Sequence, residues 1–226
     1  MKNRTLLPHP ATLFLLLSVG VAFVSWVESI YGEGNVQNLF TGESLRWLLE
    51  NADRCYLASP VFRLSLWIAP GVGILLHSGL YDALLRVLHF RPRRLSRKEK
   101  RALALATVMA ALCLLLVGIL AWGPWTTVRS ITGSLAGSPL EQGLPLLLSV
   151  TMILTGVTYG YATDAYDNDR DVVSGMAYCL ARGGGYFITL FFVVLFFALL
   201  DYTGLAPKTT LYEWFKTLFL GAGIEH

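Results

Sequence analysis

The sequence GVTYGYATDAYDNDRDVVSGMAYCLARGGGY, residues 156–186, places an Asp-rich segment between two apolar runs. Charged side chains are costly to transfer into hydrocarbon, whereas the flanking apolar runs are poorly suited to water. The simplest arrangement leaves the charged segment in water and both runs in a bilayer. This stretch therefore predicts that the chain crosses a membrane boundary more than once.

The composition supports a membrane protein. Hydrophobic residues make up 54% of the chain and charged residues only 15%, against about a quarter charged in soluble domains. The mean hydropathy is +0.55. A chain of 226 residues suits one domain, so we expect a single membrane domain over residues 1–226. The net charge of +3 is too small and too clustered to indicate a nucleic-acid partner, and the expected surroundings are a lipid bilayer.

Five apolar segments approach the length of about 20 residues that a helix needs to span the hydrocarbon. We therefore expect an all-α integral membrane protein with about five transmembrane helices. The first segment follows Lys2 and Arg4, but no small-x-small cleavage pattern comes after it, so we interpret it as a retained helix and not a signal peptide. The predicted spans are residues 11–30, 61–88, 102–122, 144–162 and 180–200.

The distribution of basic residues predicts the orientation. With these spans, 12 of the 18 Lys and Arg residues lie on the side of the N-terminus and 6 on the other. The loop RPRRLSRKEKR at residues 91–101 dominates the first group. Since Lys and Arg accumulate in cytoplasmic loops, we expect an N-terminus inside and a C-terminus outside, in the inner membrane of a bacterium. The same loop could contact anionic lipid.

Two stretches that are too short to span predict interfacial amphipathic helices. In TGESLRWLLENADR, residues 41–54, three leucines at positions 45, 48 and 49 form one face. Near the C-terminus, apolar residues recur at helical spacing between Leu211 and Phe219. Thr210 and Glu213 are in capping-box register, and Gly221 provides a stop.

The acidic block resembles the beginning of a calcium loop only superficially. Such a loop needs Gly at its sixth position and Glu at its twelfth, where this chain has Val172 and Tyr178. A solvated cytoplasmic turn is the better interpretation. The three cysteines show no metal-ligand spacing, and no nucleophile with a base is visible. We therefore expect no metal, no cofactor and no enzymatic activity.

Polar residues within the second span are the candidates for a solute or proton path: His77, Ser78 and Asp82. An ionisable group at membrane depth suggests a function. Asp82 and Arg86 are four residues apart, so an ion pair within one helix would explain Asp82 structurally. His77 is near the middle of the predicted span and could carry a proton or contact a solute. Alternatively, it is a neutral histidine bonded to a neighbouring helix.

Glycines inside the spans predict either helix breaks or close packing of neighbouring helices. Both uses occur in membrane proteins, and transporters place broken helices around their solute. The residues concerned form two groups, Pro70, Gly71 and Gly73 in the second span and Gly183, Gly184 and Gly185 in the fifth.

Several segments together resemble the AbgT family of p-aminobenzoyl-glutamate transporters, in the same order along the chain. They are LPHPATLFLLL (7–17), TGESLRWLLEN (41–51), GVGILLHSGLYDALLR (71–86), LSRKEKRAL (95–103), RSITGSLAGSPL (129–140) and the stretch 156–205. The resemblance covers most of the chain.

The resemblance implies a proton-coupled transporter of a small anionic aromatic or peptide-like solute, working as an oligomer such as a homodimer. His77 and the glycine breaks would then line the path. Members of the family are longer, and this chain looks like a shortened member without their hairpin regions. Where the family tends to have polar residues, this chain has Leu76, Leu195 and Gly204. The alternative is therefore a non-transporting scaffold, or an accessory subunit of another membrane protein, derived from the dimerisation core.

Overall fold

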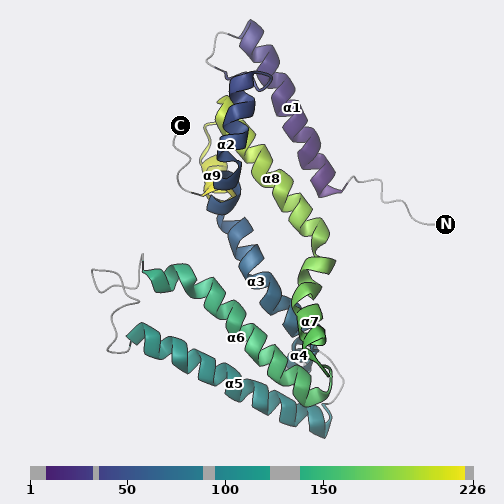
Figure 1. Cartoon of the computed structure of the whole chain (residues 1–226). Helices are drawn as coiled ribbons and strands as arrows, with labels where there is room; N and C mark the ends of the chain where they lie inside the picture. Colours follow the sequence, from purple (N-terminus) through teal and green to yellow (C-terminus); the bar gives the residue numbers. More distant parts are fainter. Residues whose placement is uncertain (1–8, 33–35, 89–94, 123–137, 222–226) are drawn as a thin grey trace, which may run out of the picture. The chain divides into compact units, whose positions relative to one another are not determined.

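The computed structural model describes residues 9–32, 36–88, 95–122 and 138–221, and within them all regular secondary structure is helical. Lys2, Arg4, the basic residues between 89 and 94, and Arg129 lie outside the described residues. The helices are α1 (Pro10–Tyr31), α2 (Gly42–Ala58), α3 (Pro60–His77), α4 (Leu80–Val87), α5 (Arg97–Trp122), α6 (Pro139–Thr163), α7 (Asp169–Arg182), α8 (Gly184–Thr203) and α9 (Thr210–Leu220) (Figure 1).

Five of the described helices are long and apolar enough to cross a membrane, namely α1, α3, α5, α6 and α8. This confirms the predicted class, an all-α membrane protein with about five spanning helices. Helices α1, α5 and α6 each contain one predicted span and extend it by at least one residue at an end. Each helix satisfies its own backbone hydrogen bonds, which is the condition for crossing lipid.

The second predicted span, residues 61–88, is wrong as a single helix. The structure divides it into α3 and α4, which are separated by Ser78 and Gly79. Gly79 has a φ of +79°, in the left-handed region that a continuing right-handed helix does not visit. Apolar residues continue on both sides of the break, so hydropathy alone merged two helices into one.

The fifth predicted span, residues 180–200, is also displaced. Helix α7 ends at Arg182, Gly183 caps it, and α8 begins at Gly184. Arg182 is part of α7, where its guanidinium donates to the Tyr178 hydroxyl at 2.6 Å. Helix α8 reaches Thr203 and has 20 residues, so it is long enough to span without Arg182.

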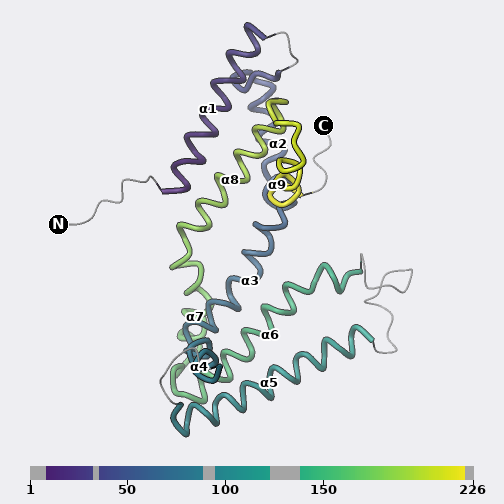
Figure 2. The backbone as a smooth tube through the Cα atoms, turned by 180° about the vertical axis from the view of Figure 1, so that it is seen from behind, coloured from purple at the N-terminus to yellow at the C-terminus, as the bar shows by residue number. Residues whose placement is uncertain are grey.

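The described chain forms two compact units, residues 1–64 with 184–226 and residues 65–183. A single membrane domain over residues 1–226 stays a prediction. In the first unit, α1 lies along α8, and α2 and α9 also pack on α8 (Figures 1 and 2). The core of this unit joins three helices through four buried side chains, Cys55, Val194, Ala198 and Leu220.

The two short amphipathic helices of the first unit form as expected, and the cap of α9 differs from the prediction by one residue. Thr209, one residue before the predicted cap, accepts a hydrogen bond from the Tyr212 amide, and Gly221 ends α9 at a φ of +82°. In α2, the leucines at 45 and 49 are exposed, whereas Cys55 is buried. The apolar face is therefore available to lipid, and the face toward the protein is partly polar.

In the second unit, α5 and α6 run side by side in opposite directions, and α4 packs on both (Figures 1 and 2). Small residues dominate the contact, because three of its five buried members are alanines. The cluster consists of Leu80, Ala83, Ala102, Ala106 and Tyr159. Alanines at the contact allow two helices to approach closely, which favours association in lipid.

Helix α3 packs on α6 and α7 at positions where it has no side chain. A Cβ added at Gly71 would lie 2.9 Å from the Ser149 carbonyl oxygen, and one at Gly73 would lie 2.7 Å from the Gly175 carbonyl oxygen. Pro70 lies inside α3 without ending it. Gly71 and Gly73 therefore permit direct contact between helix backbones.

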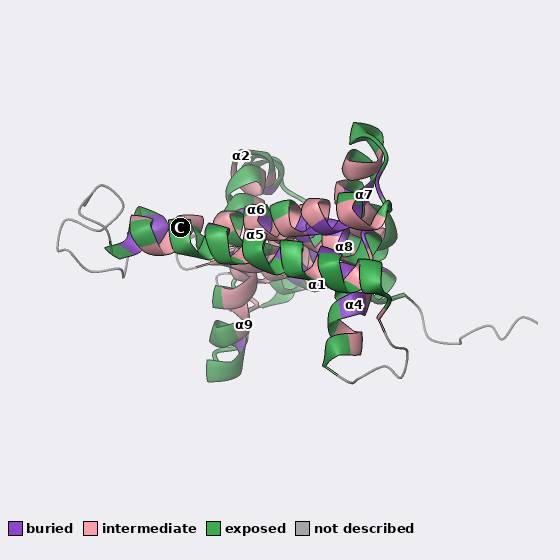
Figure 3. Cartoon of the chain, turned by 90° about the horizontal axis from the view of Figure 1, so that it is seen from below, coloured by how far each residue is buried: buried purple, intermediate pink, exposed green. Residues whose placement is uncertain are grey.

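Large apolar side chains are mostly on the outside of both units. Leu16 on α1 and Leu116 on α5 are 62% and 59% exposed, and Figure 3 shows green, exposed surface along much of α1. In water such a surface would be unstable, whereas in a bilayer it contacts lipid tails. The exposed apolar surface agrees with a membrane protein.

We expect Gly73→Ala to lower the thermal stability of the purified protein. The added methyl group meets backbone atoms of α7, which cannot move as a side chain would, and such overpacking costs about 1–3 kcal/mol. Gly118→Ala on α5 is the control, since nothing lies within 4 Å of its added Cβ. Melting in detergent compares the two, and equal midpoints would contradict the proposed contact.

Candidate functional site

The break between α3 and α4 is built around Ser78. This residue is buried, and its amide donates to the Ile74 carbonyl at 2.9 Å, so it completes the last turn of α3. Its hydroxyl oxygen accepts from the Leu80 amide at 3.3 Å, at the beginning of α4. Ser78 thus satisfies backbone groups that the left-handed Gly79 removes from the helical ladder.

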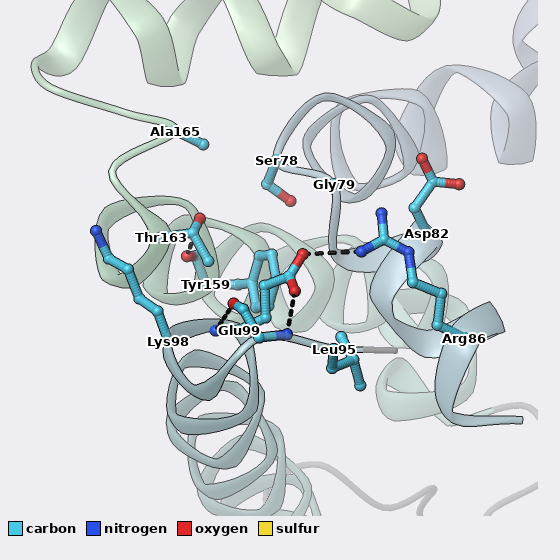
Figure 4. A pocket seen from close by; sticks show the side chains of 11 residues that line it. Ser78, Gly79, Asp82, Arg86, Leu95, Lys98, Glu99, Tyr159, Thr163 and Ala165 are labelled. Carbon is cyan, nitrogen blue, oxygen red and sulfur yellow. Dashed lines mark hydrogen bonds and ion pairs between the residues drawn. The ribbon is translucent and has the colours of Figure 1, made fainter. Parts of the chain in front are cut away.

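A polar pocket of about 580 Å³ lies beside this break in the second unit (Figure 4). Its walls come from α4, α5 and α6, together with Ala165, which lies two residues after the end of α6. Both signs of charge line it, together with the buried Tyr159. The residues that matter for its chemistry are Ser78, Asp82, Arg86, Lys98, Glu99 and Tyr159. The predicted candidates Ser78 and Asp82 therefore share one pocket.

Arg86 and Glu99 form an ion pair between α4 and α5 across this pocket, at 2.8 Å (Figure 4). The other carboxylate oxygen of Glu99 accepts from the Ser96 amide at 2.7 Å, while the Ser96 hydroxyl accepts from the Glu99 amide at 3.1 Å. Glu99 thus belongs to a capping box that starts α5. The sequence predicted Asp82 as the partner of Arg86, and the hydrogen bond that the structure shows runs to Glu99.

A second ion pair at the pocket joins Lys98 of α5 to Asp164, which caps the end of α6. Asp164 has a φ of +58°, a left-handed conformation that Asp tolerates better than most residues. Both side chains are more than half exposed, so the pair is readily broken. The cation of Lys98 is accordingly available to another anion.

His77 lies at the end of α3, so its predicted place in the middle of a span is wrong. The helix break at Ser78 and Gly79 moves it to a helix terminus. Its Nδ1 is 3.4 Å from the Tyr166 hydroxyl, its ring stacks on Tyr166, and the edge of Tyr178 is close by. These contacts fit the interpretation of a histidine bonded to a neighbouring segment. A role in a proton or solute path stays a prediction.

Tyr166 is the residue that the sequence interpretation missed. It is 2% exposed, and its ring occupies space left by Gly160. A Cβ at Gly175 would lie 2.5 Å from its hydroxyl. Burial, and then the charge of Asp171, raises the pKa of Tyr166 to about 12. The neutral hydroxyl is therefore a stable donor toward His77.

The acidic block has a structural role at the beginning of α7. Asn168 accepts hydrogen bonds from the amides of Arg170 and Asp171, at 3.1 and 3.3 Å. The Asp171 carboxylate accepts in return from the amides of Asp167 and Asn168, at 3.0 and 3.3 Å. This is a reciprocal capping box, and carboxylates in a first turn also suit the helix dipole.

The second predicted glycine group lies at the junction of α7 and α8. Gly183 caps α7, and Gly184 starts α8 with open space where a Cβ would be. A Cβ at Gly185 would lie 3.2 Å from Nε2 of His9, the residue that caps α1. The group therefore combines a helix junction with one close contact inside the first unit.

We expect a double-mutant cycle of Arg86→Ala and Glu99→Ala to give a coupling free energy of about 1 kcal/mol or more, because both side chains are largely buried. The exposed pair Arg46 and Glu50 on α2 is the matched control, and its coupling should be clearly smaller, because water screens an exposed pair. Chemical unfolding in detergent measures both cycles. Equal couplings would contradict a buried pair at the pocket.

Tyr166→Phe should reduce the loss of stability at alkaline pH. A Tyr whose pKa is raised on folding stabilises the protein fully below its unfolded pKa of about 10, and this contribution is lost as the pH rises toward about 12. Phe cannot ionise. Melting temperatures measured from pH 8 to pH 11 should therefore fall less steeply in the variant, and an unchanged slope would contradict the buried hydroxyl.

Comparisons with known proteins identify a family for the chain and a solved structure of similar fold. The sequence profile of the AbgT putative transporter family matches residues 90–214, more than half of the chain. A solved structure of MtrF from Neisseria gonorrhoeae, described with a class of antimetabolite efflux pumps, has a TM-score of 0.63 at 16% identity. The likeness covers 89% of this chain and 71% of that chain. At this identity it shows the fold alone.

Among curated proteins, no relative matches the chain. The family match includes the predicted basic loop, the acidic block and the helices α5 to α8, and it begins three residues after α4. It covers the three later motifs on which the resemblance was based, whereas the motifs at residues 7–17, 41–51 and 71–86 lie outside it. Together with the five spanning helices, this match shows that the chain is a multi-pass membrane protein that belongs to the AbgT putative transporter family.

Proposed function

We propose that this chain moves a small anionic aromatic or peptide-like solute, of the p-aminobenzoyl-glutamate class, across the membrane as an oligomer. The observation that carries the proposal is the polar pocket at the Ser78–Gly79 break. Interrupted helices are the usual place of solute contact in secondary transporters, because freed backbone groups are then available to ligands. Its volume of about 580 Å³ suits a small organic solute.

The two cations of the pocket provide the selectivity for an anion. Lys98 is held by Asp164 in an exposed ion pair, and a solute carboxylate can take the place of Asp164 at little cost. Arg86 offers a planar guanidinium that suits a carboxylate, although Glu99 already holds one side of it. Asp82 in the same pocket disfavours a purely anionic ligand, which favours a solute that also carries a neutral or donor group.

His77 is the residue that we propose for proton coupling. It lies next to Ser78 at the break, is exposed, and has Tyr166 as a hydroxyl neighbour. We further propose the inner membrane of a bacterium, with the N-terminus inside, from the distribution of Lys and Arg. A homodimer, or a partner membrane protein, would enclose the path together with the five spanning helices.

Purified protein in lipid vesicles tests the proposal. We expect p-aminobenzoyl-glutamate flux that depends on a pH gradient and falls at least tenfold in His77→Ala. The matched control is His9→Asn, which removes a histidine but keeps a side chain that can cap α1. MtrF is described with antimetabolite efflux pumps, so flux is measured in both directions. Equal flux in His77→Ala and His9→Asn would exclude the proposed coupling role.

The alternative proposal is a scaffold or accessory subunit without transport. It is favoured by the apolar residues Leu76 and Leu195, where the resemblance leads us to expect polar groups. The third such position, Gly204, has a local explanation, because its φ of +74° at the end of α8 suits Gly best and Asn next. No flux together with a stable dimer, or a partner that co-purifies, would support this alternative and contradict transport.

A further inference from the structure

An apolar pocket of about 360 Å³ lies in the second unit, separate from the polar one. It is formed between α4, α5 and α6, with one contribution from α3. Most of its residues are Leu or Ala, with Met152, Tyr81 and three threonines as the others. Among those that line it are Leu80, Leu84, Leu103, Ala106, Ala110 and Met152.

Three threonines also line this pocket without making it polar. The hydroxyl of Thr107 donates to the Leu103 carbonyl at 2.8 Å, that of Thr151 to Leu147 at 2.8 Å, and that of Thr155 to Thr151 at 2.7 Å. Each hydroxyl hydrogen is therefore already used within its own helix. These hydroxyls therefore offer no free donor to a polar ligand, and a hydrocarbon chain can lie against them without leaving a donor unpaired.

Helix α4 separates the two pockets. Asp82 and Arg86 line the polar pocket, while Leu80 and Leu84 line the apolar one. The short helix α4 is thus amphipathic, with a polar face on the polar pocket and an apolar face on the apolar pocket. A dicarboxylate solute suits the first pocket and is unsuited to the second, because a charged group in an apolar space is strongly disfavoured.

The apolar pocket lies within the depth of one leaflet, since its lining residues on α5, from Leu103 to Ala110, cover about 10 Å of helix. Lys100, Leu103 and Thr107 are three and four residues apart, so they lie on one side of α5, and Lys100 is exposed. From Lys100 to Ala110, at the deep end of the pocket, ten residues of helix cover about 15 Å. This is about half of the 30 Å hydrocarbon core. The pocket therefore begins below a cation and ends near the middle of a bilayer.

We infer that this pocket binds one acyl chain of an anionic phospholipid, whose phosphate is held by Lys100. An apolar space within one leaflet, with an exposed cation one helical turn beyond its outer end, matches the arrangement of such a lipid. Each basic residue near an anionic surface contributes about 1 kcal/mol to lipid attraction, which corresponds to about a fivefold change in affinity.

Native mass spectrometry of the purified full chain, titrated with phosphatidylglycerol and with phosphatidylcholine, tests the inference. We expect tighter binding of phosphatidylglycerol, with a roughly fivefold loss in Lys100→Ala. Arg101→Ala is the matched control, since it removes the same charge at the same level but 100° around α5. Ala110→Phe should reduce binding of both lipids by filling the pocket, whereas Val108→Phe, on the exposed side of α5, should not.

Several results would overturn the inference. Equal losses in Lys100→Ala and Arg101→Ala would indicate diffuse attraction by the basic surface. Unchanged binding in Ala110→Phe would show that the chain lies elsewhere, and dissociation of an oligomer by this variant without lipid release would indicate a protein occupant. Should Ala110→Phe fail to fold, as judged by melting, Thr107→Phe fills the pocket one turn away. Lipid binding is measured without solute, so its failure is independent of transport.

Discussion

Direct contact between helix backbones is the constraint on which the second unit depends. Lipid tails are as apolar as leucine, so apolar side chains alone give helices little reason to associate in a bilayer. Close approach provides dispersion contacts instead, and it requires that the contact positions lack side chains. Gly71 and Gly73 meet the backbones of α6 and α7 in this way. Without these glycines, α3 could not pack where it does, and the break that follows it would have no fixed surroundings.

The same contact controls the polar groups at the end of α3. The Gly175 carbonyl faces Gly73, while the missing side chain of Gly175 leaves room for the Tyr166 hydroxyl and for Nδ1 of His77. One residue of α7 therefore serves both the packing of α3 and the position of its terminal histidine. A shift of α3 along α7 would separate His77 from Tyr166. The packing of α3 and the position of His77 therefore depend on the same residue, Gly175, within the second unit.

The sequence predicted most helices of this protein well but did not show which of their faces contact protein, for a physical reason. Twenty apolar residues identify a span whichever side faces protein, because lipid and protein interior are both apolar. Leu45 and Leu49 were predicted to form one face of a helix, and they do, but this face is the exposed one. The break at Gly79 was hidden within apolar sequence. The Arg86–Glu99 pair and the Tyr166 contact depend on residues 13 and 89 positions away, which spacing cannot connect.

The helix break itself distinguishes the two proposals for function. A scaffold needs only helices that associate, and α4 also serves this by packing on α5 and α6 after the break in the predicted span 61–88. Breaking it requires Gly79 in a left-handed conformation, a buried Ser78 hydroxyl to satisfy the backbone, and charged side chains close to the membrane. Each of these is unfavourable in lipid unless water or a ligand reaches the site. A polar pocket supplied with such groups is therefore easier to explain by solute contact than by dimerisation alone.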